Sequence, residues 1–173
     1  MDTEEIFDVV DESGRVIGSA PRGRVHGDPS LLHRSVHVLV LNGNGELFLQ
    51  KRSANKDIQP GKWDTSVGGH VGLGEEVQAA ARREMEEELG IREAEIGFLY
   101  SYLWRSAVES ELVTSYLCRY EGPIRVLRSE IEEGLYWSLP AIEIKLGSGT
   151  FTPNFEEEYS RLKKYLQGKS GMP

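Results

Sequence analysis

Residues 69–91 read GHVGLGEEVQAAARREMEEELGI and hold most of the chemistry that this chain offers. The stretch from about Glu76 to Leu89 contains no glycine or proline, which predicts a helix. Gly90 follows at the position where a helix commonly ends in a left-handed residue. The segment therefore predicts a glycine-rich loop, a helix and a sharp stop.

Three glutamates of this helix share one face. Glu84, Glu87 and Glu88 stand at i, i+3 and i+4. Carboxylates this close repel one another unless a cation lies between them, and oxygen ligands suit Mg²⁺ or Mn²⁺. Such a site could polarise a phosphoryl oxygen and supply an activated water. The acidic run alone leaves open a simpler interpretation, a solvated helix face.

The surrounding pattern favours the metal site. Five residues separate Gly69 from Glu75, seven more lead to Arg83-Glu84, and Gly90 is followed by the apolar Ile91. This spacing resembles the Nudix box at every defined position. The resemblance to the Nudix hydrolase superfamily implies an α/β fold, an α/β/α sandwich around a mixed sheet, with residues 1–173 as a single domain.

The same resemblance implies roles for individual residues. The three helix glutamates would be metal ligands, with Mg²⁺ or Mn²⁺ as the cofactor, and Glu84 or a nearby carboxylate would help to activate water. Glu75 would lie in the loop near the metals. Arg83 would pair with a loop carboxylate and keep the loop and helix rigid. Gly69 would let the loop backbone turn tightly.

The other expected elements are mostly strands. Two short strands flank a turn at 12–14, and a tight hairpin at 42–45 joins two more. A strand pair is expected over 95–105 and 111–122, a shorter strand over 134–139, and a final helix over about 155–166. Strands that separate the main helices suggest a mixed sheet with helices packed on it.

Outside the box, WDTSVGGHVGLGEE and the histidines of RVHGDPSLLHRSVHVLV are similar to type I isopentenyl-diphosphate isomerases, which share the Nudix fold. This likeness implies a second metal site, formed by His26, His33, His70, Glu109 and Glu111. It also implies a grip on the substrate diphosphate by Arg22, Arg52 and Lys56, whose charges neutralise phosphate oxygens.

Each of these residues also has an ordinary interpretation. A single histidine is more often a core or surface residue than a ligand, and Arg52 and Lys56 could be solvated loop charges. We expect His37, inside an apolar strand, to be structural. Aromatic residues in the later strands could stack on a ring but are more often core: Tyr100, Tyr102, Trp104, Tyr136 and Trp137.

Two departures weigh against an isomerase. Gly68 stands where those enzymes carry a proton-transferring cysteine, and glycine has no side chain to move a proton. Asn154 stands where they carry a tryptophan, and it offers no cation-π face. Cys118, the one cysteine, lies in a different strand. The isomerases have a degraded Nudix box, whereas this box is intact.

The sequence therefore predicts a Mg²⁺-dependent hydrolase that cleaves a diphosphate linkage in a nucleoside diphosphate derivative or a related organic diphosphate. An isomerase-like protein and a non-catalytic module that binds a nucleotide remain the alternatives. Nothing in the sequence selects the organic part of the substrate.

Composition restricts the partners. The 173 residues carry a net charge of −8, which argues against broad binding to nucleic-acid backbones. No apolar run is long enough to span a membrane, and the acidic start lacks the layout of a secretory signal. One cysteine excludes an internal disulfide, so we expect a cytoplasmic protein. The oligomeric state stays open, with a homodimer as one option.

Overall fold

The computed structural model describes residues 4–56 and 58–170. Its strands are β1 (Ile6–Val10), β2 (Val16–Pro21), β3 (Leu32–Leu41), β4 (Leu47–Arg52), β5 (Trp63–Asp64), β6 (Val67–His70), β7 (Ile96–Arg105), β8 (Ser110–Arg119) and β9 (Ile131–Trp137). Its helices are α1 (Arg22–Val25), α2 (Val77–Leu89), α3 (Leu139–Lys145) and α4 (Pro153–Ser170).

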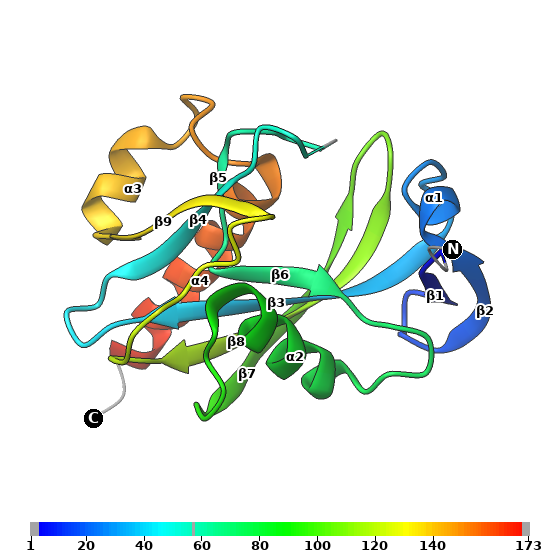
Figure 1. The fold of residues 1–173 in the computed structure, drawn as a ribbon, viewed down its shortest axis with the longest axis horizontal. Helices are drawn as coiled ribbons and strands as arrows, with labels where there is room; N and C mark the ends of the chain where they lie inside the picture. Colours follow the sequence, from blue (N-terminus) through cyan, green and yellow to red (C-terminus); the bar gives the residue numbers. More distant parts are fainter. Residues whose placement is uncertain (1–3, 57, 171–173) are drawn as a thin grey trace.

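Strand β3 is the centre of a mixed sheet (Figure 1). It runs parallel to β8 along its whole length and antiparallel to β6, while β7 continues the sheet beyond β8. Strand β4 pairs instead with β5 and β9. β3 and β4 pair only at Leu41 and Leu47, next to their hairpin. The two strands therefore diverge from the hairpin onward.

The two faces of β3 bury different cores, because side chains alternate along a strand. Val36, Val38 and Val40 pack with Ala81 and Met85 of α2. Leu39 and Leu41 belong to a second core together with side chains of α4. Helices thus cover both faces of the sheet (Figure 1), and the expected α/β/α sandwich is confirmed.

Most expected elements are present, with corrections at their ends. Helix α2 ends at Leu89, and Gly90 caps it with φ 69°, as predicted. The last strand was predicted too late and too short, since β9 begins at Ile131. The final helix was also predicted too short, because α4 begins at Pro153 and continues to Ser170. Four short elements were missed altogether: α1, α3, β5 and β6.

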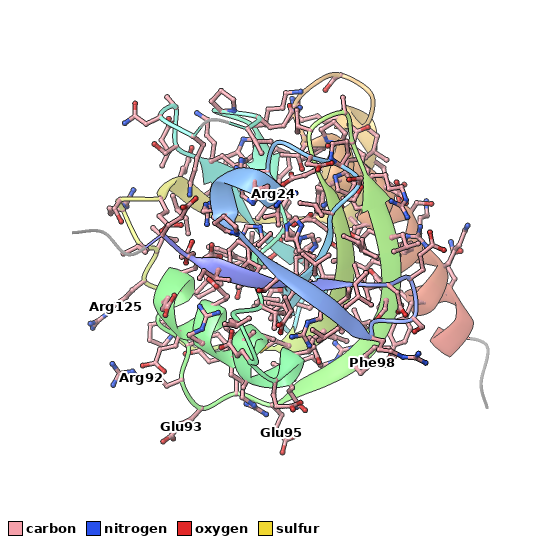
Figure 2. The ribbon with its side chains drawn as sticks, turned by 90° about the vertical axis from the view of Figure 1, so that its right-hand side faces the viewer. Arg24, Arg92, Glu93, Glu95, Phe98 and Arg125 are labelled. Atoms are coloured by element: carbon pink, nitrogen blue, oxygen red, sulfur yellow. The ribbon has the colours of Figure 1, made fainter. Side chains whose placement is uncertain are left out.

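The segment that follows α2 is strongly charged. Arg92, Glu93 and Glu95 point away from the body of the molecule (Figure 2), and none of them lines the main cavity described below.

Among the described residues, no helix is long and apolar enough to cross a membrane.

Candidate active site

A cavity of about 750 Å³ lies where elements from the whole chain meet. Its walls come from α1, β3, β6, α2, the turn between β7 and β8, the segment after β4 and the start of α4. Every site residue predicted from the sequence lines it, except His33, which lies buried behind the wall.

The helix glutamates lie at different depths in this cavity. Glu88 is 6% exposed and accepts hydrogen bonds from Gln50 Nε2 at 2.9 Å and from the Gly68 N–H at 3.2 Å. Burial raises the pKa of the Glu88 carboxyl to about 8, and burial also raises the pKa of Glu84. Glu87 is more exposed. A buried carboxyl group beside a partly buried one, both with raised pKa values, fits a site that receives a cation.

Arg83 fixes the loop to the helix. Its guanidinium donates to both carboxylate oxygens of Glu75 at 2.9 and 3.0 Å, to Glu84 Oε1 at 2.6 Å and to the backbone oxygen of His70 at 3.0 Å. These hydrogen bonds lower the pKa of Glu75, which also accepts the Gly72 N–H. The structure thus contains the expected pair between Arg83 and a loop carboxylate.

Three histidines converge beside the glutamates. Nε2 of His26 lies 3.1 Å from Nε2 of His70 and 3.6 Å from Glu109 Oε2. Ligand atoms of His26, His33, His70 and Glu109 all lie within 4.8 Å of one another. Glu111 Oε1 reaches this group at 3.5 Å from His70 and 3.7 Å from His33. The fold therefore brings together all five residues of the expected second metal site.

The electrostatics of this cluster suit metal ligation. Burial, together with the neighbouring His70, lowers the pKa of His26 to about 4, so its imidazole is neutral at neutral pH, as a metal ligand must be. Burial would raise the pKa of Glu111, but His70 and His33 outweigh it and lower that pKa to about 2. His33 is fully buried, and within the described part of the chain neither ring nitrogen makes a hydrogen bond of ordinary geometry. A cation would satisfy these groups.

The three predicted diphosphate-binding residues line the cavity, and each also has an acidic neighbour. Arg22 pairs with Glu5 at 2.8 Å, Arg52 with Asp64 at 3.3 Å and Lys56 with Glu130 at 3.2 Å. All three are partly exposed, so these ion pairs are weak and a phosphate could compete for the cations.

The family model for the NUDIX domain matches residues 31–155. The chain belongs to the Nudix family. Its match contains the helix glutamates, the loop with Glu75 and all histidines except His26. Relatives and solved structures support the same assignment.

Curated relatives cover nearly the whole length of this Nudix protein. An uncharacterized Nudix hydrolase of Streptomyces coelicolor is 35% identical over 97% of this chain and 93% of its own. An uncharacterized Nudix hydrolase of Pseudomonas aeruginosa is 33% identical over 94% of both chains. The protein is thus a Nudix hydrolase.

Solved structures agree on the fold. The crystal structure of DR0079 from Deinococcus radiodurans has a TM-score of 0.80 with 26% identity, covering 91% of this chain and 98% of the other. A MutT protein from Methanosarcina mazei gives a TM-score of 0.64 with 26% identity over 79% of this chain and 97% of its own.

Several cavity residues of the Nudix hydrolase escaped prediction. Gln50 hydrogen-bonds to Glu88, and Asp64 accepts from Thr152 Oγ1 at 3.0 Å. His37, expected to be structural, does form a buried pair with Glu158, yet it also lines the cavity. No local pattern announces these residues, because each contact joins segments distant in sequence.

The structure also places the residues at which this sequence departs from the isomerases. Gly68 lines the cavity, whereas Cys118 is buried in the core beneath α2. Asn154 lines the cavity too and accepts a hydrogen bond from the Tyr102 hydroxyl at 2.8 Å. Of the five aromatic residues considered for stacking, Trp104 lines the cavity and the other four do not.

Proposed function

We propose that this Nudix hydrolase cleaves a diphosphate linkage in a nucleoside diphosphate derivative or a related organic diphosphate, with Mg²⁺ or Mn²⁺ as its cofactor. The observation that carries the proposal is the group of Glu84, Glu87 and Glu88 in the cavity, where burial raises the pKa of Glu88 to about 8. Hard carboxylate oxygens are the ligands that these cations prefer.

Different residues would bind the cation and hold the loop in position. When bound, the divalent cation neutralises phosphate charge and makes water more acidic. Glu84, Glu87 and Glu88 would hold it, and the Glu84 side chain lies directly against Gly69 of strand β6. Arg83 and Glu75 hold the loop against the helix, so the carboxylates keep their positions while substrate enters.

The substrate diphosphate would extend from these carboxylates toward the cationic walls. Arg52 and Lys56 line one wall and Arg22 another. Each is held by a partly exposed carboxylate, which screens its charge only weakly when the site is empty. Arginine offers several donors in a fixed fork, which matches two phosphate oxygens at once.

A second cation would be held by the histidine cluster. His26, His33, His70, Glu109 and Glu111 converge, and the ion pair of buried His33 with Glu111, at 3.7 Å, is too long for a hydrogen bond, which supports a bound ion. Mixed imidazole and carboxylate ligands suit Mn²⁺ or Zn²⁺ better than Mg²⁺. This cation would bind near the main site and add positive charge to the cavity.

An isomerase activity is disfavoured, because Gly68 offers no side chain for proton transfer and the relatives from Streptomyces coelicolor and Pseudomonas aeruginosa are Nudix hydrolases. A non-catalytic nucleotide-binding module is disfavoured because all the box glutamates are retained.

The test is a screen for diphosphate cleavage over nucleoside diphosphates, sugar nucleotides and prenyl diphosphates, with and without Mg²⁺. The products are separated by chromatography, because a sugar nucleotide yields two phosphomonoesters and a terminal diphosphate yields a monophosphate and phosphate. We expect metal-dependent product release from at least one class, and Glu84→Gln should reduce kcat at least ~100-fold because a ligand oxygen loses its charge. The matched control is Glu86→Gln on the same helix, since Glu86 pairs with Arg92 and lies outside the cavity. Near wild-type turnover by Glu84→Gln, or release without metal, would refute the proposal.

A further inference from the structure

His37 lies on the floor of the cavity and is fixed from behind by a buried carboxylate. Its Nδ1 lies 2.6 Å from Glu158 Oε2 of α4, and Glu158 is fully buried. The Ser115 hydroxyl of β8 donates to the other oxygen of Glu158. A buried carboxylate is destabilised without a cationic partner, and His37 is in direct contact with this one. Burial would lower the pKa of His37, but the charge and hydrogen bond of Glu158 raise it to about 9.

The contact with Glu158 determines which atom of His37 faces the cavity. Since Nδ1 is engaged by Glu158, Nε2 lies on the other side of the ring, and His37 lines the cavity. Gly68 is its cross-strand neighbour on β6. A Cβ at residue 68 would lie 3.3 Å from Cδ2 and 3.5 Å from Nε2 of His37. Glycine at this position therefore leaves that edge of the ring uncovered.

Two further polar atoms beside His37 lack partners. Thr65 and Ser35 are each 2% exposed and line the same cavity. Within the described residues, neither hydroxyl oxygen has a hydrogen-bond partner. Buried hydroxyl groups are normally satisfied, by protein, water or ligand. Both oxygens are enclosed by the surrounding protein, so they make this wall of the cavity polar without themselves offering a contact to a ligand.

The polar patch adjoins the acidic site. The Gly68 N–H donates to Glu88 Oε2, while a Cβ on the same residue would contact the His37 ring. One residue thus separates the imidazole from a proposed metal ligand. A molecule held at the glutamates would reach His37 with its neighbouring atoms.

We infer that His37 is a substrate-contacting residue whose Nε2–H donates to an oxygen acceptor of the substrate, in a subsite bounded by Gly68, Thr65 and Ser35. This inference rests on the proposed function, because the ligand is the same diphosphate compound. The acceptor chemistry is an electron-rich oxygen, either of a phosphate or of a carbonyl in the organic part. Glu158 is the positioning residue that keeps the imidazole charged and oriented.

The direct test is NMR of the full-length protein labelled with ¹⁵N-histidine, in Mg²⁺ buffer at pH 7.5. His37→Gln identifies the His37 signals by their loss. We expect both ring nitrogens of His37 to be protonated before any ligand is added. Inorganic pyrophosphate and uridine are then titrated separately: a shift of the Nε2–H signal by pyrophosphate assigns the acceptor to a phosphate, and a shift by uridine assigns it to a carbonyl. A neutral His37, or an unchanged signal once other resonances show that both probes are saturating, overturns the inference.

Kinetics on the best substrate of the screen provide the second measurement. Loss of a charged hydrogen bond should raise KM about 10–100-fold in His37→Gln, with kcat changed less than ~3-fold. Because that variant leaves Glu158 buried and unpaired, Gly68→Ala is the companion: it covers the imidazole edge while keeping the ion pair, and should raise KM in the same direction. Ser101→Ala, at an exposed position of β7 outside the cavity, leaves this network intact and should stay within about twofold of wild type. Unchanged KM in both His37→Gln and Gly68→Ala would contradict the inference.

The outcomes separate this subsite from the proposed reaction. If wild type cleaves none of the compounds in the screen, the proposed function fails, yet the NMR titrations still test His37. If Glu84→Gln loses kcat while the His37 variants keep wild-type KM, the reaction stands and the subsite fails.

Discussion

At the residue scale, Gly69 shows how closely strand β6 and helix α2 are fitted together. A Cβ built on Gly69 would overlap the side chain of Glu84, with Cδ and Cγ as the nearest atoms. Glu84 cannot move freely, because its Oε1 accepts from Arg83 at 2.6 Å. The glycine is needed here for the close approach of a side chain, since its φ is not in the left-handed region. The family resemblance had predicted that Gly69 lets the loop backbone turn tightly. That reason was wrong, because Gly69 lies in strand β6.

Gly69→Ala should therefore impair the site more than the fold. We expect kcat for metal-dependent diphosphate cleavage to fall at least ~100-fold, because Glu84 must leave its position. Overpacking should lower the free energy of unfolding by about 1–3 kcal/mol. Turnover assays and urea unfolding measure the two effects. Gly18→Ala in β2 is the control, since its Cβ would meet nothing within 4 Å. Full activity of Gly69→Ala would show that Glu84 has more freedom than the structure indicates.

At the element scale, the interactions that the sequence predicted are local ones. The spacing of the helix glutamates fixes their common face, and Gly90 marks the end of α2. The starts of α3 and α4 also carried a local signal. Ser138 and Thr152 each precede the first turn of a helix with proline, and their hydroxyl oxygens accept from Ala141 N and Phe155 N. Attention to these caps would have placed both helix starts correctly.

No local sequence pattern indicates where α4 packs against the sheet. Glu158 lies 121 residues from His37, and its contact depends on how α4 packs across β3 and β8. A glutamate in the run FEEEY looks like surface charge, although Glu158 is fully buried. The polar face of the cavity could not be predicted for this reason: it forms only when the sandwich closes.

This pair should make stability depend on pH. Glu158 faces His37 from α4, with Asp64 of β5 and Glu111 of β8 farther off, and together they raise the pKa of His37 to about 9 against the effect of burial. The folded pKa lies above the unfolded value, so the stabilisation is complete below about pH 6.5 and is lost as pH rises through about 9. The expected loss is roughly 1 kcal/mol per pH unit within that window.

A double-mutant cycle measures the interaction energy between His37 and Glu158 separately from other effects of the two substitutions. Urea unfolding of wild type, His37→Gln, Glu158→Gln and the double variant, all in EDTA, gives the coupling energy at pH 6.5 and at pH 9.5. We expect a favourable coupling at pH 6.5 that is much smaller at pH 9.5. A coupling that is independent of pH would mean that His37 is not charged in the folded protein.

At the scale of the whole molecule, the sequence predicted which residues lie together in the site. It did not predict the arrangement of strands that forms the cavity around them. The order of the histidines and glutamates, together with the family resemblance, named five residues that do converge. The cavity itself results from the divergence of β3 and β4, which pair only at Leu41 and Leu47. That divergence is a property of the sheet and has no counterpart in any short segment.

The histidine cluster joins parts of the chain that are remote in sequence. His26 ends α1, His33 lies in β3, His70 ends β6, and Glu109 and Glu111 lie where β8 begins. α1 and the turn between β7 and β8 lie at the same end of the sheet (Figure 1). A cation bound by these residues would cross-link several elements, so its binding should stabilise the entire fold.

Metal binding at this cluster should therefore raise the melting temperature even when the glutamate site is disabled. In a Glu84→Gln/Glu88→Gln background, Mn²⁺ or Zn²⁺ at ~100 times its Kd should add about 2.7 kcal/mol to the free energy of unfolding. Adding His26→Asn or His70→Asn to that background should abolish the gain, because each removes a ring nitrogen from the cluster. His37→Gln, which alters a histidine outside the cluster, should keep the gain despite a lower starting stability. An equal gain in all these variants would mean that the cation binds elsewhere and that the convergence of the histidines serves packing alone.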